Sequence, residues 1–471
     1  MSSSSFKPTL RLLDATMVVA GSMIGSGIFI VSADITRHVG SAGWLIAIWL
    51  ITGFMTITAA LSYGELSGMY PKAGGQYVYL KEAYNPLIGF LYGWSFFSVI
   101  QTATIAAVGV AFAKFTAYLF PVFSEDAVVV QIGTYTISPA QLLSIVVIIL
   151  LTYINTRGIK SGKTIQTSFT LAKLLSLFGL IVFGLLAFDV QIWNNNWINA
   201  WSVQKLLPGS SIESYTTIAA LGAVAAAMVG SIFSSDSWNN VTFIAGEIKN
   251  PQRNIGLSLF LGTLIVTLIY VCTNLVYMSV LSLDAIAGAE KDRVGVTAAQ
   301  VIFGNAGTII IAIMIMVSTF GCNNGLILAG ARVYYTMAQD KLFFKKAGHL
   351  NKNNVPGYAL WFQCLFACGW SLSGQYGQLL DMISFVVVGF YMLTIAGIFI
   401  LRKKQPAAHR PYKAVGYPVL PIIYILMGLS FCGLLIFFKP AYTWPGLIIT
   451  LLGIPIYYFI RKNDPEQKEP G

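Results

Sequence analysis

The chain has 471 residues, of which 56% are hydrophobic and only 10% are charged, and its mean hydropathy is +0.72. Soluble domains carry about 25% charged residues, so the composition excludes an ordinary soluble protein and predicts one with many membrane spans. The net charge of +11 would suggest a nucleic-acid partner in a soluble protein, but the basic residues lie in short loops between apolar segments, so membrane topology explains them better and no nucleic acid is expected.

Twelve apolar segments are long enough to cross the lipid bilayer, which predicts an all-α polytopic membrane protein. They lie near residues 11–36, 43–68, 86–118, 138–157, 164–187, 218–248, 255–283, 298–338, 357–374, 377–401, 416–438 and 443–460. Few basic residues fall in the gaps that follow odd-numbered spans, and most fall in the other gaps and at the termini. Lysine and arginine favour the cytoplasmic side, so both tails, residues 1–10 and 461–471, are expected in the cytoplasm of a cell-membrane protein. No cleavable signal peptide is apparent.

Lys173 lies near the middle of the fifth span, residues 164–187. It stands ten residues after Lys163, the expected cytoplasmic edge, which corresponds to roughly 15 Å of helix and about half of a hydrocarbon core. A charge at that depth costs at least about 2.5–3.5 kcal/mol unless it faces protein or water and has a partner. The alternative is an ammonium that reaches the interface along its alkyl chain, but the side chain is less than half as long as that path. Lys173 is therefore predicted to belong to a functional site.

Two spans contain residues that interrupt a helix. The first carries Gly25-Ser26-Gly27 at mid-span, and the sixth carries four small polar or acidic residues in a row, 234–237. Glycine costs a helix about 1 kcal/mol relative to alanine, and exposed backbone groups in lipid are tolerated only where they line a cavity. A shift of 209 residues superimposes the two breaks, and the second is threaded in the opposite direction. Matched breaks in two inverted halves predict a transporter with a site near the midplane, whereas chance packing of small residues is the alternative.

The ends of the broken helices define the expected ligand. Free amides at the start of the outer half of span one would bind an anion, and free carbonyls at the ends of the other half-helices would bind an ammonium. An anion pocket beside a cation pocket suits a zwitterionic α-amino acid. The candidate substrate-binding residues are Met23, Ile24, Gly25, Ser26, Gly27, Ile232, Phe233 and Asp236.

Asp236 admits two roles. As an N-cap it would begin the inner half-helix of span six, with Ser237-Trp238-Asn239 as its first turn, and aspartate suits that position. As a pocket residue it would offer a carboxylate to a cationic substrate side chain or titrate with the substrate. Ser235 could form the cap alone, yet a free carboxylate at mid-membrane is costly unless it is paired. Capping is the favoured interpretation, and the second role stays open.

A set of motifs carries a family resemblance. They are, in chain order, residues 21–29 (GSMIGSGIF), 63–66 (YGEL), 71–80 (PKAGGQYVYL), Lys173, Phe233 through 250–254 (NPQRN), and Arg332 with Asp340-Lys341. In this order they resemble the amino acid–polyamine–organocation superfamily, specifically the L-type amino acid transporter family, over almost the whole chain.

The resemblance implies a LeuT-like fold with two inverted five-helix repeats, residues 11–187 and 218–401, and two extra helices in 416–460. It implies sodium-independent transport of neutral α-amino acids by alternating access. The amides of Ser26 and Gly27 would bind the carboxylate, carbonyls near Met23 and Phe233 would bind the amine, and the Phe233 ring would close over the substrate. Lys173, next to hydroxyls such as Ser318, would replace a sodium ion. Asn239 would hold the inner half of span six against span one.

Two departures from the family pattern affect substrate and partner. Ser234-Ser235 stand where the family often has Ala-Tyr, which leaves the preferred side chain open. Residues 119–137 contain no cysteine, so the disulfide-linked partner subunit of animal members is not expected.

Other classes of function fit less well. The five cysteines and three histidines form no metal or catalytic cluster, so no enzyme, metal or cofactor is expected. A channel would need a filter or charge ring rather than paired broken helices. Exchange is the favoured mode of transport, and proton-coupled symport, with acceptance of cationic amino acids, is the alternative. Near the inner face, Glu65, Glu247 and Arg253 either form ion pairs that close the inner side or are solvated charges.

Overall fold

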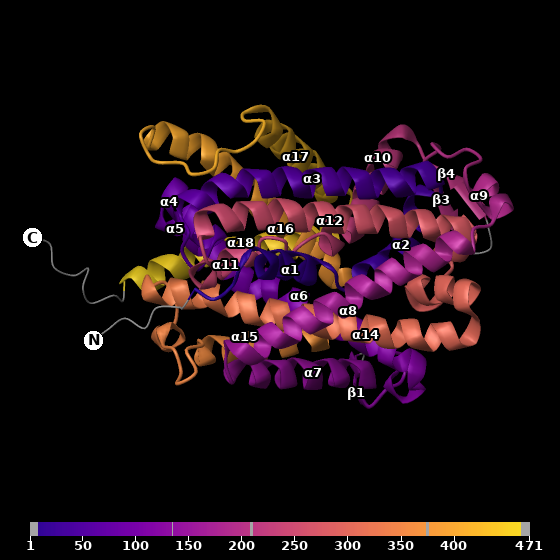
Figure 1. Cartoon of the computed structure of the whole chain (residues 1–471), viewed down its shortest axis with the longest axis horizontal. Coiled ribbons are helices and arrows are strands. Elements are labelled where there is room, and N and C mark those ends of the chain that lie inside the picture. The colour runs from indigo at the N-terminus through magenta and orange to yellow at the C-terminus, as the bar shows by residue number, and fades with distance from the viewer. Residues whose placement is uncertain (1–7, 134, 208–210, 374–375, 463–471) are drawn as a thin grey trace, which may run out of the picture.

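The computed structural model describes residues 8–462 except 134, 208–210 and 374–375. The expected tails, 1–10 and 461–471, therefore lie largely outside the described residues. The first and last described residues lie at one end of a helical bundle, at the left of Figure 1, and two short hairpins lie at the opposite end. We call these the terminal end and the hairpin end.

The first half of the chain begins with a broken span and continues with long helices. Its elements are α1 (Leu12–Met23), α2 (Gly27–Val39), α3 (Ala42–Met69), α4 (Gln76–Ala83), α5 (Pro86–Ser95), the π-helix η1 (Phe96–Ile100), α6 (Gln101–Leu119), η2 (Pro121–Phe123), β1 (Val130–Ile132), β2 (Tyr135–Ile137), α7 (Pro139–Thr156) and α8 (Ile159–Leu186). β1 and β2 pair antiparallel, as do the two strands that follow α8. Neither hairpin was expected from the sequence.

The second half repeats the pattern of a broken span followed by long helices. Its elements are α9 (Val190–Asn196), β3 (Gln204–Leu207), β4 (Ser211–Ser214), α10 (Thr217–Ser234), α11 (Asn240–Phe243), η3 (Ala245–Glu247), α12 (Pro251–Val280), α13 (Leu283–Ala287), η4 (Glu290–Asp292), α14 (Val294–Gln339), η5 (Lys345–Gly348), α15 (Gly357–Ser373), α16 (Tyr376–Lys404), α17 (Val419–Phe438) and α18 (Pro440–Lys462). α1–α2 runs from the terminal end to the hairpin end, and α10–α11 runs the other way (Figure 1).

The helix count agrees with a polytopic membrane protein. Among the described residues, ten helices are long and apolar enough to cross a membrane, and the bent pair α1–α2 makes eleven. The remaining expected span, 357–374, corresponds to α15, whose 17 residues are at the lower limit for crossing a bilayer.

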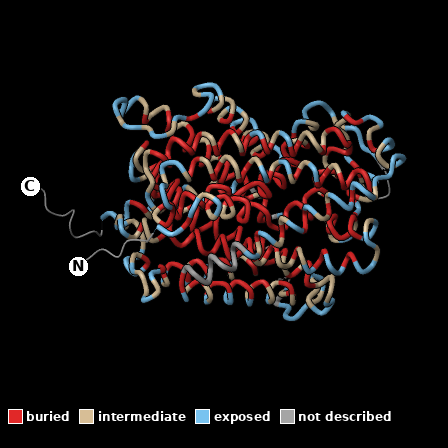
Figure 2. Tube along the Cα trace, in the orientation of Figure 1, coloured by how far each residue is buried: buried red, intermediate tan, exposed pale blue. Residues whose placement is uncertain are grey.

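The broken spans lie inside the bundle. α1 packs against α12, α8 and α14, and α2 packs along α10. Figure 2 shows buried residues concentrated around these central segments. Backbone groups freed by the breaks therefore meet protein rather than lipid, which is the condition for such breaks in a membrane.

Candidate functional site

The break in the first span supplies one wall of the site. α1 ends at Met23, α2 begins at Gly27, and the two helix axes differ by 43°. All five predicted residues, Met23 to Gly27, are buried. The carbonyl end of one short helix and the amide end of another thus meet at one point, so main-chain groups alone can bind an ammonium and a carboxylate.

Lys173 of α8 contacts this break directly. Its side chain is fully buried, and its ammonium donates hydrogen bonds of 2.6 Å to the carbonyl oxygens of both Gly21 and Ile24. Ser318 of α14 lies 3.5 Å from the same Ile24 carbonyl and 3.5 Å from that of Gly25. The ammonium does not extend to the interface. It lies at the end of α1, where Ser318 of α14 approaches the same carbonyl.

Cys322 lies one turn beyond Ser318 and closes the same side of the break. Its thiol is 3.1 Å from the carbonyl oxygen of Ser22, and a Cβ added to Gly25 would lie 3.2 Å from its sulfur. That distance is tighter than ordinary packing, so Gly25 allows α14 to approach the unwound backbone. The sequence analysis gave Cys322 no role of its own.

The break in the sixth span supplies the opposite wall. α10 ends at Ser234, with Ile232 and Phe233 buried in its last turn, and α11 begins at Asn240. Ser237 adopts a left-handed backbone conformation (φ 64°), which L-residues rarely adopt and which ends helical geometry there. The interruption is therefore a full turn of irregular backbone rather than a kink.

Tyr270 of α12 joins the two breaks. Its hydroxyl lies 3.0 Å from the carbonyl oxygen of Met23 and 3.0 Å from that of Ser234. A substrate ammonium at Met23 would therefore share this carbonyl with Tyr270. The sequence analysis missed this residue, since its only sequence signal is a tyrosine in the middle of an apolar span.

Gly27 and Ser234 bring the two breaks into contact. A Cβ added at Gly27 would lie 2.0 Å from the Ser234 hydroxyl oxygen and 3.1 Å from its Cα. The Ser234 hydroxyl in turn donates to the carbonyl of Gly230, at 2.7 Å. Glycine at position 27 is thus a condition for the close approach of α2 and α10.

The preferred role of Asp236 is corrected by the structure. The inner half-helix begins at Asn240 with Asn239 at the N-cap, so residues 237–239 are not its first turn and Asp236 does not cap it. The left-handed Ser237 explains the difference, because it separates Asp236 from the helix. The buried Asp236 carboxylate instead accepts a hydrogen bond of 2.5 Å from the hydroxyl of Tyr391 on α16.

Asn239 supports the broken helix through a different neighbour than expected. Its side chain donates to the Gln76 side-chain oxygen at 2.9 Å, and Gln76 donates to Thr394 of α16 at 3.0 Å. Span one is therefore not the partner of the Asn239 side chain. α11 itself does pack against α1.

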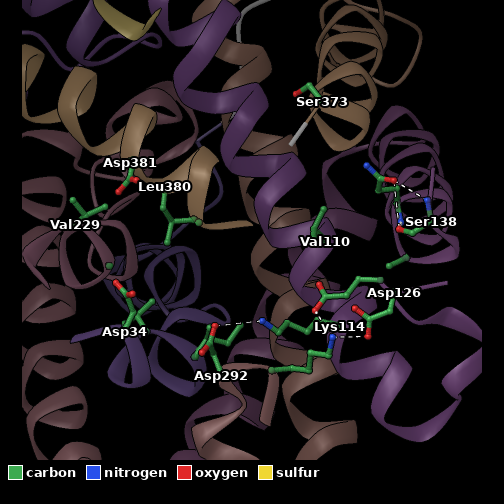
Figure 3. A pocket seen from close by; sticks show the side chains of 18 of the residues that line it. Asp34, Val110, Lys114, Asp126, Ser138, Val229, Asp292, Ser373, Leu380 and Asp381 are labelled. Carbon is green, nitrogen blue, oxygen red and sulfur yellow. Dashed lines mark hydrogen bonds and ion pairs between the residues drawn. The ribbon is translucent and has the colours of Figure 1, made fainter. Parts of the chain in front are cut away.

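A cavity of about 720 Å³ leads from the hairpin end toward the breaks. Its deeper lining includes Ile30 and Val31 of α2 and Val229 and Gly230 of α10, one turn from Gly27 and Ser234. Figure 3 shows Asp34, Lys114, Asp292 and Asp381 around this cavity. Ion pairs bridge its walls, and they include Arg37–Asp292 at 2.8 Å, Lys291–Asp126 at 2.5 Å and Lys439–Asp381 at 3.5 Å.

The terminal side of the breaks is closed. Two small cavities, of about 10 and 20 Å³, lie next to the sixth-span break. Glu65 pairs with Arg402 at 2.6 Å and Arg410 at 3.2 Å, and the fully buried Arg332 pairs with Glu247 at 3.2 Å. These two glutamates form the ion pairs considered from the sequence.

Arg253 and the residues that precede α1 also lie at the terminal end. Arg253 is exposed and forms no ion pair with a described residue, so it is not part of the closure. Leu10 instead bridges Ile248, and the carbonyl of Glu247 accepts hydrogen bonds from the amides of Thr9 and Leu10. Among the described residues, no group of three His, Cys, Asp or Glu side chains is arranged to hold a metal ion.

The fold is that of a multi-pass membrane protein in which two broken helices meet inside the bundle. The model of the amino acid permease family matches residues 10–459, and the chain belongs to this family. The serine/threonine exchanger SteT of Bacillus subtilis is 29% identical over 98% of both chains. Human large neutral amino acids transporter small subunit 2 is 29% identical over 96% of this chain and 80% of its own, and mouse b(0,+)-type amino acid transporter 1 is 27% identical over 98% and 89%. The relatives are transporters, so the chain is a transporter rather than an enzyme.

Proposed function

We propose that the protein is a sodium-independent exchanger of small or medium neutral α-amino acids. The observation that carries the proposal is the position of the Lys173 ammonium, 2.6 Å from the carbonyls of Gly21 and Ile24. A fixed cation there supplies the charge that a bound sodium ion would otherwise provide. The name of the B. subtilis relative, a serine/threonine exchanger, supports exchange of small neutral substrates.

The main-chain ends at the two breaks bind the amino acid backbone in this proposal. The amides of Ser26 and Gly27 bind the carboxylate, and carbonyls at Met23 and Phe233 bind the amine, which favours an ionised α-amino acid over other small molecules. Phe233 closes over the bound substrate. Ile232, Ile24 and Gly25 complete the walls.

The cavity at the hairpin end and the ion pairs at the terminal end describe one state of an alternating-access cycle. We assign the terminal end to the cytoplasm, because basic residues concentrate in the gaps on that side. The structure then corresponds to an outward-facing carrier in the cell membrane. Residues 11–187 and 218–401 form the two inverted repeats, which move relative to each other when the carrier changes to its inward-facing state.

A disulfide-linked partner is not part of this proposal. One relative is named as a small subunit, which marks that protein as part of an assembly. The segment 119–137 of this chain contains no cysteine, and all five cysteines lie within helices. The chain therefore has no thiol in the segment where animal members of the family form the covalent link.

Proton-coupled symport is the second candidate, and Asp236 is the observation that favours it. A buried carboxylate at mid-membrane whose hydrogen-bond donor is a hydroxyl needs a proton or a cationic substrate group to balance its charge. Uptake of radiolabelled serine by proteoliposomes, with and without internal serine and with and without a pH gradient, separates the two modes. Exchange predicts dependence on internal amino acid, and symport predicts uptake into empty liposomes driven by the gradient.

A further inference from the structure

Asp236 and Tyr391 form a buried pair beside the sixth-span break. Asp236 is 8% exposed and Tyr391 is 7% exposed, and their 2.5 Å hydrogen bond joins the break to α16. None of the ion pairs among the described residues includes Asp236. A carboxylate in this position therefore has no cation among the described residues to balance its charge.

The titratable groups that face Asp236 are tyrosines. They are Tyr63 of α3, Tyr92 of α5, Tyr391 of α16 and Tyr424 of α17. The rings of Tyr63 and Tyr391 pack against Trp238, with centroids 4.7 and 5.1 Å from that of the indole. Phenols remain neutral near neutral pH, so the surroundings offer hydrogen bonds without charge.

Two small cavities meet at the pair. One, of about 10 Å³, is lined by Asp236, Tyr391 and the amide side chains of Gln76, Gln101 and Asn240. The other, of about 20 Å³, is lined by Asp236, Tyr391 and hydroxyls that include Thr52 and Ser235. Each has room for about one water molecule and enough polar groups to hold it.

The side-chain nitrogen of Asn240 is a buried polar group near the pair. It lines the smaller cavity and makes no hydrogen bond with a described residue. A buried donor of this kind normally binds ordered water. The π-helix η1 also contributes Phe96 and Ile100 to the same cavity, and π-helical turns are frequent at functional sites.

We infer that the Asp236–Tyr391 pair is a proton-binding site, with water in the two cavities as the route by which the proton enters and leaves. The carboxylate takes one proton from water and becomes a neutral acid, which removes the cost of a bare charge while the carrier changes state. On release the proton returns to water and the carboxylate regains its charge. This inference rests on the proposed transport function and adds a second ligand, the proton, to it.

According to this inference, the carrier transports neutral amino acids when the carboxyl group of Asp236 is protonated and uncharged. Raising the pH on both sides of the membrane equally removes the proton and lowers the rate. Asp236→Asn keeps the shape of the side chain without the charge, so its rate should not depend on pH. Tyr391→Phe removes a donor that stabilises the carboxylate, so the proton is held more tightly and the fall in rate should move to higher pH.

The test measures serine exchange in proteoliposomes at equal internal and external pH, from mildly acidic to alkaline, for the wild type, both variants and Glu213→Gln, an exposed control that is 60% accessible and paired with Lys205. From the lowest to the highest pH, we expect the exchange rate to fall at least threefold for the wild type and the control. The rate of Asp236→Asn should stay constant, and the fall in the rate of Tyr391→Phe should occur at higher pH than in the wild type. If Asp236→Asn does not fold, the shift of the pH dependence in Tyr391→Phe tests the inference by itself.

Other results would overturn the inference. If Asp236→Asn and Tyr391→Phe both show the same dependence of exchange rate on pH as the wild type, the pair does not bind the proton. Loss of arginine exchange in Asp236→Asn, with the pH profile of serine exchange unchanged, would also overturn it and would assign Asp236 to recognition of cationic side chains. A wild type that moves no neutral amino acid at any pH contradicts the proposed function instead, so the two failures are distinguishable.

Discussion

The ammonium of Lys173 lies 2.6 Å from the carbonyl oxygen of Ile24, the first residue beyond the last turn of α1. This contact joins a helix of the first repeat to the unwound backbone where the substrate is proposed to bind. Because the same ammonium also binds the Gly21 carbonyl, it fixes both sides of the last turn of α1. The contact explains why a charge is retained at mid-membrane.

The first prediction concerns Lys173→Ala. Without the ammonium the carbonyls of Gly21 and Ile24 lose their cation, the break loosens, and serine exchange should fall to less than half. Substrate binding, measured by protection against thermal unfolding, should fall less than turnover. Lys205→Ala removes an exposed lysine and serves as the control. Wild-type exchange by a well-expressed Lys173→Ala protein would contradict the assigned role.

The second prediction concerns the hydroxyl that joins the two breaks. Tyr270→Phe removes one hydroxyl proton that the carbonyls of Met23 and Ser234 share, a hydrogen bond worth about 0.5–1.5 kcal/mol, so exchange should slow by roughly two- to tenfold. Tyr277→Phe, on the same helix, removes one weaker contact of 3.3 Å to Ile28 and should have a smaller effect. Equal effects of the two variants would show that bridging the breaks is not what matters.

A third prediction follows from the contact of α2 with α10. Gly27→Ala places a methyl group 2.0 Å from the Ser234 hydroxyl oxygen, so the two helices must separate and exchange should fall at least tenfold. Adding Ser234→Gly removes the obstructing side chain and should restore part of the rate. Gly179→Ala on α8, where nothing lies within 4 Å of the added carbon, is the control. No recovery in the double variant would argue against this clash.

The fourth prediction concerns the buried ion pair at the terminal end. Glu247→Gln leaves the charge of Arg332 without its carboxylate, which costs about 3–5 kcal/mol for a buried pair. The closed terminal end should then open more often. A reporter cysteine at Asn240, in a protein without its native cysteines, should react faster with an impermeant thiol reagent added from the terminal side.

The exposed pair of Lys205 and Glu213 provides the comparison for this experiment. Glu213→Gln should leave the labelling rate unchanged, because exposed ion pairs contribute only about 0–1 kcal/mol. Unchanged labelling in Glu247→Gln would instead mean that its ion pair with Arg332 does not help to close the terminal end.

The sequence was sufficient where one residue type carries a strong physical constraint. A lysine at mid-membrane and glycines in an apolar span are costly unless structure compensates, so Lys173 and the break at Gly25 could be predicted. Partners supplied by distant segments of the chain could not be predicted. The hydroxyls of Tyr270 and Tyr391 come from α12 and α16, and their spans look like ordinary apolar helices.

The errors have a local physical cause. Capping by Asp236 was expected because aspartate is a preferred N-cap residue and suits the positive end of a helix dipole, but the left-handed conformation of Ser237 cannot be predicted from one sequence. The partner of Asn239 was missed for a different reason. Gln76 lies 163 residues away, and nothing in the sequence indicates that α4 returns to the sixth-span break.

Transport without sodium is the central claim, and serine uptake into proteoliposomes tests it most directly. Liposomes preloaded with unlabelled serine receive radiolabelled serine in sodium medium or in medium where choline replaces sodium. The position of the Lys173 ammonium predicts equal uptake in the two media. The proposed exchange mode predicts much less uptake when the liposomes contain no amino acid. Loss of uptake in choline would contradict the claim that Lys173 takes the place of a sodium ion.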